Sequence, residues 1–188
     1  MTMNRRDALK SFVVMMGGTM VGANVILTGC APETQIEGLD FSPDDIAFLD
    51  EIGEAIIPTT DTPGAKATEI GNFMVEMVKA TYDKGQQETF VNGLNSLRKN
   101  FKSDKGEDFV KASPENRTAY LNQLKSQSMN NPEDPEGPHY ISMLRDLTVL
   151  GYFTSEIGAT QALRYVETPG KYEGCVPYQK GDRAFALG

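Results

Sequence analysis

The two cysteines and the single histidine are the residues of this chain best suited to covalent chemistry. An imidazole beside a thiol can activate it as a nucleophile, so Cys175 and His139 form one conceivable catalytic pair. Nothing in the sequence brings these two residues together. Cys30 ends an apolar N-terminal stretch, which indicates a role in protein export.

A cation site is the second kind of chemistry that the residue types allow. Glu133, Asp134 and Glu136 precede His139, and a carboxylate-rich loop can hold a cation. Their spacing does not match an EF-hand, and a solvated acidic loop is the simpler interpretation. Because His139 is the only histidine, a histidine-based metal site would need other residue types to complete it. We therefore predict no metal site and no cofactor-binding residue on this chain.

No motif of an independent enzyme or of a nucleic-acid-binding protein is present. The sequence lacks G-x-S-x-G, C-x-x-C and a strand-linked G-x-G-x-x-G. It also lacks a constellation of acid, base and nucleophile, so we predict no catalytic residue. The 18 basic and 26 acidic residues give a net charge of -8. Phosphate binding requires clustered lysine and arginine, so this charge argues against nucleic acid as a partner.

Residues 1–30 have the order of a secretory signal peptide. A basic start is followed by an apolar run from Phe12 to Leu27 and by small residues before Cys30. The run is shorter than the ~20 residues of a spanning helix, which argues against a permanent transmembrane helix. Arg5 and Arg6 lie in NRRDALK, which resembles the twin-arginine motif of proteins exported in the folded state. Ordinary secretion is the alternative.

The end of this leader resembles a lipobox. In the sequence LTGC, Cys30 would be lipidated and become the first mature residue, so that its acyl chains hold the protein to a bilayer. The alternative is that Cys30 only ends the leader. Acylation predicts a periplasmic, membrane-anchored lipoprotein and leaves Cys175 without an internal partner. In an oxidising compartment such a lone thiol is buried, reactive or bridged to another chain.

After the leader we expect a tether over residues 31–41 and one helical domain over residues 42–188. Removing the leader takes away three basic residues and one acidic residue, so the net charge moves from -8 to -10. Ser42-Pro43 and Ser113-Pro114 each predict a helix start, with the serine as cap and the proline in the first turn. Pro58 ends the first helix, and Lys102–Glu107 is predicted to be a charged turn.

Apolar residues spaced by three and four predict five helices and their buried faces. The helices begin near Pro43, Thr68, Gln86, Pro114 and His139, and Asn130–Pro138 is predicted to be a surface loop. The inward residues are Ile46, Leu49, Ile52 and Ile56, then Ile70, Phe73, Met74, Met77 and Val78, then Phe90, Leu94, Leu97 and Phe101, then Tyr120, Leu121 and Leu124, and then Ile141, Leu144, Leu147 and Leu150. No stretch alternates with period two. The fold class is therefore all-α, a bundle of five or six helices with an irregular C-terminal arm.

The stretch from Leu144 to Tyr178 has the features of a surface that another protein covers. An apolar helix leads to small residues and then to a tail rich in proline, glycine and tyrosine, and tyrosine is a favoured interface anchor. The alternative is an arm that packs on its own bundle. The loop over residues 57–65 is interpreted first as a helix connector, with partner contact as its alternative. The candidate interface residues are Pro58, Pro63, Gly64, Gly151, Tyr152, Phe153, Ser155, Glu156, Pro169, Gly170, Tyr172, Pro177 and Tyr178.

Three segments carry a resemblance to a known family. They are Ala55–Thr59 (AIIPT) with Pro63-Gly64-Ala65, Leu150–Glu156 (LGYFTSE) and Pro169–Pro177 (PGKYEGCVP). With these segments the chain resembles the gluconate 2-dehydrogenase subunit 3 family, the small subunit of membrane-bound, flavin-dependent sugar and alcohol dehydrogenases. The resemblance covers nearly the whole mature chain. It implies a subunit without a redox centre, bound to a large FAD-dependent flavoprotein of the glucose-methanol-choline type.

The resemblance and the leader together suggest one mechanism. The chain would bind the flavoprotein before export, support its maturation, carry it through the twin-arginine route and remain attached as a lipid-tethered subunit. A multihaem cytochrome c subunit often passes the electrons on in this family, and Cys175 is our candidate for an interchain disulfide. The competing hypothesis is a free-standing envelope lipoprotein that binds a ligand or partner without any dehydrogenase.

Overall fold

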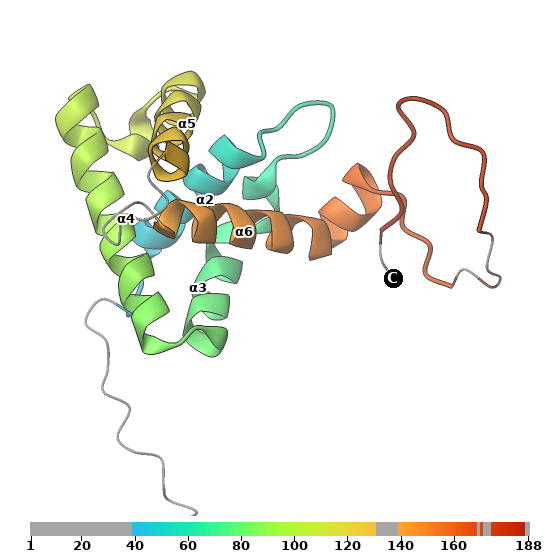
Figure 1. The fold of residues 1–188 in the computed structure, drawn as a ribbon, viewed down its shortest axis with the longest axis horizontal. Coiled ribbons are helices and arrows are strands. Elements are labelled where there is room, and N and C mark those ends of the chain that lie inside the picture. The colour runs from blue at the N-terminus through green and yellow to red at the C-terminus, as the bar shows by residue number, and fades with distance from the viewer. Residues whose placement is uncertain (1–38, 131–138, 169, 171–173, 187–188) are drawn as a thin grey trace, which may run out of the picture. The chain divides into compact units, whose positions relative to one another are not determined.

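The computed structural model describes residues 39–130, 139–168, 170 and 174–186, which belong to one compact unit. Five α-helices make up most of this part of the chain (Figure 1). They are α2 (Pro43–Ile56), α3 (Ile70–Thr81), α4 (Lys84–Lys105), α5 (Pro114–Asn130) and α6 (His139–Thr154), with short helical turns η1 (Ala65–Thr68), η2 (Phe109–Lys111) and η3 (Gly158–Ala162). Within these ranges there is no strand, so the predicted all-α bundle is confirmed.

Several predictions from the sequence concern residues outside this part of the chain. These are the leader with Arg5, Arg6 and Cys30, the tether up to residue 38, and residues 131–138 of the predicted surface loop. Of the helices in the described ranges, none combines the length and the apolar character needed to cross a membrane.

Helix α2 begins where the sequence predicts and lies against three other helices. The Asp45 N–H donates to Ser42 Oγ at 3.3 Å, and the Asp45 carboxylate accepts from the Ser42 N–H at 3.0 Å. This reciprocal capping box satisfies amide groups that the first helical turn cannot pair internally. The helix ends at Ile56, two residues before Pro58. Because α2 contacts α3, α5 and α6, its apolar face becomes the centre of the bundle.

Helix α4 is longer than the sequence indicated. It starts at an Asp83 cap and continues to Lys105, and Gly106 then ends it with a left-handed φ of 73°. The predicted charged turn over Lys102–Glu107 is therefore wrong in its first four residues. The physical reason is that lysine is a good helix former, and solvent-facing charges do not interrupt a helix whose other face is buried.

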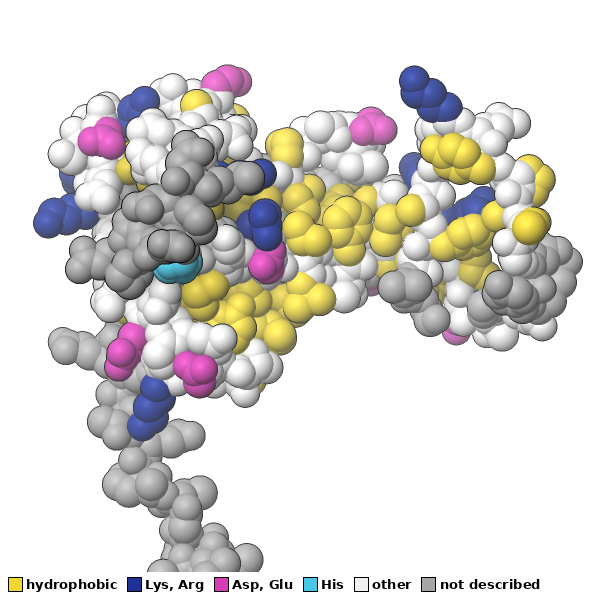
Figure 2. Space-filling view, in the orientation of Figure 1, with side chains coloured by type: hydrophobic (Ala, Val, Ile, Leu, Met, Phe, Trp, Pro, Cys, Tyr) yellow, Lys and Arg dark blue, Asp and Glu magenta, His cyan; other side chains and the backbone are white. Residues whose placement is uncertain are grey.

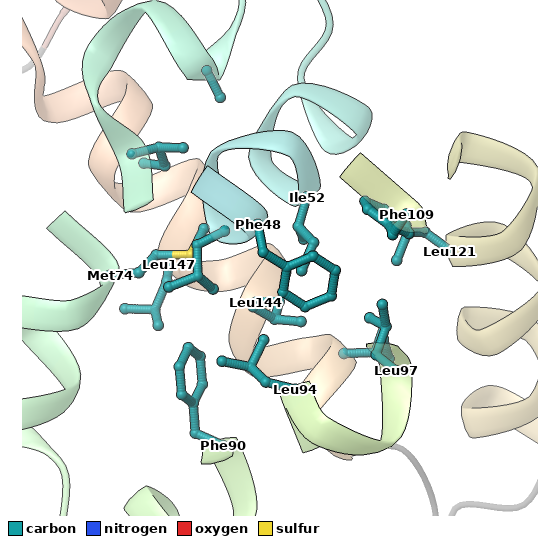
Figure 3. Close-up of a cluster of buried hydrophobic side chains, with 14 of the residues drawn as sticks. Phe48, Ile52, Met74, Phe90, Leu94, Leu97, Phe109, Leu121, Leu144 and Leu147 are labelled. Atoms are coloured by element: carbon teal, nitrogen blue, oxygen red, sulfur yellow. The ribbon is translucent and has the colours of Figure 1, made fainter. Parts of the chain in front are cut away.

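The core is formed by side chains from all five α-helices and from η2. Figure 3 shows these side chains pointing toward one another from α2, α3, α4 and α6, with Phe109 and Leu121 beside them. Phe101 packs edge-on against Phe109 and Tyr120, with ring centroids 4.9 and 5.0 Å apart. All four predicted inward residues of α4 are buried, as are Leu49 and Ile52 of α2. Leu150 was predicted to face inward, and this is wrong, because its side chain lies on the solvent side of α6.

The last residues of the predicted tether belong to the domain. Leu39 and Phe41 pack against the core, and the Phe41 ring lies 6.2 Å from the Phe90 ring. The tether prediction is therefore wrong at these residues, because an apolar side chain next to an exposed core edge gains free energy by covering it.

A buried arginine joins α5 to α2 and η2. Arg117 forms an ion pair with Glu51, and its guanidinium also donates to the carbonyls of Phe109 (2.8 Å) and Val110 (2.7 Å). Only 9% of Arg117 is exposed, so this charge depends on its partners. Removing one member of such a pair leaves a buried charge uncompensated, which is strongly destabilising.

Candidate partner interface

Helix α6 has apolar residues on two opposite faces. One face buries Leu144, Leu147 and Gly151 in the core. The other exposes Val149, Leu150 and Phe153, whose exposed fractions are 42%, 45% and 40%. We call these three residues the α6 apolar surface. The solvent side of α6 carries Arg145 and Asp146 in the middle of the helix, so the exposed apolar residues are grouped near its C-terminal end, where they form a candidate contact surface.

Among the described residues, the large exposed apolar side chains are concentrated toward the C-terminus. Nine large hydrophobic side chains are exposed in the described part of the chain, and eight of them lie between residues 149 and 185. Figure 2 shows hydrophobic side chains gathered over α6 and on the segment that follows η3. The eight are Val149, Leu150, Phe153, Tyr165, Val166, Val176, Tyr178 and Phe185. Contiguous exposed apolar surface usually marks an interaction site.

The buried face of α6 is positioned by a glycine. A Cβ atom on Gly151 would lie 2.5 Å from Ile70 Cδ1 and 2.5 Å from Phe73 Cδ1, closer than real contacts allow. Only a residue without a side chain therefore lets α6 approach α3 this closely. The element that lies close to α6 at Gly151 is therefore α3 of the same chain.

Tyr152 joins α6 to the loop that follows α2. Its ring is buried, with 2% exposed, and its hydroxyl donates to the Pro63 carbonyl at 2.7 Å. Phe153 contacts the Tyr152 ring edge-on, with centroids 5.1 Å apart, and lies on the solvent side. One residue of this pair therefore holds the fold together, and the next one contributes to the exposed surface.

The loop over residues 57–64 is organised by one carboxylate. Glu54 accepts hydrogen bonds from the Thr59 N–H (2.8 Å), the Thr59 hydroxyl (2.7 Å) and the Lys66 N–H (3.1 Å). Burial raises the pKa of Glu54, but these hydrogen bonds outweigh it and lower the pKa below its ordinary value. A Cβ atom on Gly64 would lie 2.3 Å from Glu54 Oε2, so the glycine makes room for this carboxylate.

The segment after η3 forms an extended arm, which we define as residues 163–186. Its two ends meet: the Arg164 N–H donates to the Ala184 carbonyl at 2.8 Å, and the Ala186 N–H donates to the Arg164 carbonyl at 3.0 Å. The Arg164 guanidinium also lies over the Phe185 ring, 3.7 Å from its centroid. We call these contacts the Arg164–Phe185 clasp. From Arg164 to Phe185 every arm residue whose burial is described is exposed, so the arm does not pack on its own bundle there.

The two residues considered for covalent chemistry are not brought into a catalytic arrangement. Cys175 is a free thiol on the arm and is exposed, which rules out the buried alternative. It has no hydrogen-bond partner among the described residues, so the structure gives no support to a pair with His139, which begins α6. Within the described ranges no three residues of metal-binding type come together, and Glu133, Asp134 and Glu136 lie outside those ranges.

Asp50 and Tyr140, which lie outside the candidate interface, have raised pKa values that follow from their structural surroundings. Burial raises the pKa of Asp50, whose carboxylate accepts from the Gly71 N–H at 2.8 Å and so fixes the start of α3. Burial raises the pKa of Tyr140 to about 12. Tyr140 packs on Gly93, where an added Cβ would lie 2.2 Å from the Tyr140 ring. Both groups lie at helix contacts, and Tyr140 also lines a cavity of about 700 Å³ together with Asp83, Ser96 and His139.

The predicted interface residues fall into three groups. Gly64, Gly151 and Tyr152 are buried, which corrects their assignment as contact residues: they support the surface from inside. Pro169 and Tyr172 lie outside the described residues. The remaining members are exposed or half-buried and stay predictions: Pro58, Pro63, Phe153, Ser155, Glu156, Gly170, Pro177 and Tyr178.

Val149 and Leu150 were not predicted from the sequence as members of the exposed surface. At 100° per residue they lie with Phe153 on the side of α6 opposite Leu144 and Gly151. A helical plot of His139–Thr154 would have shown apolar residues on both sides. The arm residues Tyr165, Val166, Val176 and Phe185 were not predicted either, because the arm is extended and helical spacing gives no signal for them.

Comparison with known proteins gives one match, at the level of a family. No curated protein and no solved structure matches the chain significantly. The model of the family described as gluconate 2-dehydrogenase subunit 3 matches residues 43–170, which is more than half of the 188-residue chain. The match begins with the first residue of α2 and extends into the arm. This chain therefore belongs to the gluconate 2-dehydrogenase subunit 3 family.

Proposed function

We propose that this chain is the non-catalytic small subunit of a periplasmic, FAD-dependent sugar or alcohol dehydrogenase, and that it exports and tethers the flavoprotein. The observation that carries the proposal is the exposed apolar surface between residues 149 and 185. An acidic, water-exposed chain is expected to cover such a surface with a partner. Membership of a family named for a third dehydrogenase subunit supplies the kind of partner.

The contact would use a rigid part and an adaptable part. The α6 apolar surface is held in place by the core, because Gly151 and Tyr152 fix the helix from behind. The arm adds Tyr178, 75% exposed, together with Val176 and Tyr165. Aromatic side chains of this kind are common energetic anchors of interfaces. Because the described part of the arm is held mainly at its base, it can adjust its shape to a partner surface.

The redox chemistry would belong to other polypeptides. FAD is expected on the large glucose-methanol-choline-type subunit, and haem c on a possible cytochrome c subunit. A flavoprotein that binds FAD before export needs a route for folded proteins, and it can lack a signal of its own if it travels with a partner that carries Arg5 and Arg6. Acylation of Cys30 would then keep the complex at the membrane after export.

Cys175 is the proposed covalent link to the flavoprotein. It is exposed on the arm, next to Val176 and three residues from Tyr178, so a partner that covers these side chains would approach the thiol. An exposed thiol in an oxidising compartment forms disulfides readily. The native complex should run as one larger band on a non-reducing gel and separate on reduction. Identical bands under both conditions would rule the link out.

The export and tethering roles are tested in the organism with the complete chain. Replacing Arg5 and Arg6 by lysine should leave the flavoprotein and its FAD-dependent activity in the cytoplasm. Cys30→Ala should release the complex from the membrane without abolishing that activity. Purification of the wild-type protein in mild detergent should yield a yellow complex with a flavin spectrum. A colourless monomer would instead favour a free-standing lipoprotein, and periplasmic flavoprotein activity in a deletion strain would contradict the export role.

A further inference from the structure

A groove lies between α5, α6 and the end of α2. Its volume is about 410 Å³, which is in the range of small-molecule binding sites. The apolar part of the lining is formed by Ala55, Ile56, Pro58, Leu121 and Ile141, and the uncharged polar part by Thr118, Asn122 and Ser142. Pro58 is one of the predicted interface residues, but no other lining residue belongs to that set, to the α6 apolar surface or to the arm, so the proposed subunit role accounts for little of the groove.

The charge of the groove is opposite to the charge of the protein. The whole chain has 26 acidic and 18 basic residues. The two ionised side chains that line the groove are nevertheless both cations, Lys125 and Arg145. Lys125 is exposed and forms no ion pair with any described residue. An apolar lining with cations at its edge complements a ligand that joins an apolar stem to an anionic head.

The hydrogen bonds around the groove leave donors available. Arg145 uses Nε and Nη2 on Asp146 Oδ1, at 3.0 and 2.8 Å, and its Nη1 makes no hydrogen bond to a described residue. The Thr118 hydroxyl donates to the Ala55 carbonyl at 3.2 Å, so this carbonyl near the end of α2 already has a donor. The free donors of Lys125 and Arg145 come from facing helices, which suits two-sided contact with one carboxylate.

We propose that this groove binds a small carboxylic acid with a short apolar stem. The stem lies along Leu121 and Ile141, and the carboxylate lies between the Lys125 ammonium and the Arg145 guanidinium. A carboxylate fits better than a neutral head group, because the Lys125 ammonium and the Nη1 group of Arg145 are positively charged hydrogen-bond donors. The apolar side chains of Ile56, Leu121 and Ile141 provide the contact surface for the stem.

The test uses hexanoate and the acylated wild-type protein in lipid nanodiscs, with NMR of its methyl groups. Hexanoate should shift the methyl signals of Leu121 and Ile141 in a saturable manner and leave Val149 and Leu150 unchanged. Acetate and 1-hexanol, which lack the stem or the charge, should each bind at least about tenfold more weakly. Lys125→Gln and Arg145→Gln should each raise the Kd for hexanoate about tenfold, equivalent to about 1.4 kcal/mol.

Lys99→Gln is the matched control, because Lys99 is an exposed lysine on α4 away from the groove lining. It should leave the Kd for hexanoate unchanged. Equal binding of hexanoate and 1-hexanol, an equal effect of all three variants, or shifts confined to Val149 and Leu150 would each overturn the proposal. Because the flavoprotein is absent from the experiment, failure here leaves the subunit role untouched.

Discussion

Tyr152 and Phe153 are neighbours in the sequence, yet substitution should affect mainly folding stability at Tyr152 and mainly partner binding at Phe153. Tyr152 is 2% exposed and donates to the Pro63 carbonyl, so Tyr152→Ala should lower the free energy of unfolding by about 3–5 kcal/mol. Phe153 is 40% exposed, and Phe153→Ala should cost only about 1 kcal/mol of stability. Its main effect should be on binding of the flavoprotein.

The size of that effect follows from the exposed area of the ring. A phenylalanine buries on the order of 200 Å² when fully covered, so 40% exposure leaves about 80 Å² for a partner. At about 25 cal/mol per Å², covering this area contributes about 2 kcal/mol. Phe153→Ala should therefore weaken the complex about 30-fold. The estimate assumes that the partner covers the exposed part of the ring completely.

The assay compares thermal unfolding, followed by circular dichroism, with the affinity of the purified flavoprotein for the immobilised subunit. Val110→Ala is the matched control, because Val110 is also 40% exposed but lies on η2, outside residues 149–185. Its binding should remain within about twofold of wild type. If Phe153→Ala and Val110→Ala bound the flavoprotein equally well, the α6 apolar surface would not be the contact.

Two further predictions concern the elements beside this surface. Glu54→Gln should destabilise the protein at pH 7, and the difference should shrink as the pH falls below 4.5: folding lowers the pKa of Glu54, so its contribution is fully present above 4.5 and is lost as the pH falls through the folded pKa. Urea unfolding of both proteins over a series of pH values measures this, and a difference that does not shrink toward low pH would contradict it. Phe185→Ala should open the Arg164–Phe185 clasp and speed tryptic cleavage at Lys180 and Arg183 about threefold, as expected from loss of an exposed cation–π contact. The melting temperature of the bundle should not change, and an unchanged cleavage rate would show that the clasp does not restrain the arm.

The helices could be predicted because their signals are local. The Ser42 capping box, the Pro58 stop and the spacing of Phe90, Leu94 and Leu97 each depend on residues within one or two turns. Where the prediction failed, the deciding contact was distant in sequence. Phe41 belongs to the domain because Phe90 lies beside it, and no local pattern contains that information.

The interface was predicted less accurately for a related reason. Glycine and aromatic residues near the end of α6 were assigned to one surface, although an α-helix points successive side chains in different directions. Gly151 and Tyr152 contact Ile70, Phe73 and Pro63, three residues contributed by α3 and the loop after α2. Knowledge of these neighbours was needed to separate the buried positions from the exposed ones.

The division between buried Gly151 and Tyr152 and exposed Leu150 and Phe153 explains how so small a bundle can present a fixed apolar surface. Gly151 lets α6 lie close to α3, and this close approach determines how far Phe153 and Leu150 stand out from the bundle. The Glu54 hydrogen bonds hold the loop that receives the Tyr152 hydroxyl, so the same helix is fixed from a second side. The α6 apolar surface is thus ordered before any partner arrives, and binding need not include the entropy cost of ordering it. The exposed arm would lose conformational entropy when it becomes ordered on binding. We therefore expect α6 to contribute the larger share of the affinity, and the arm to adapt to the shape of the partner.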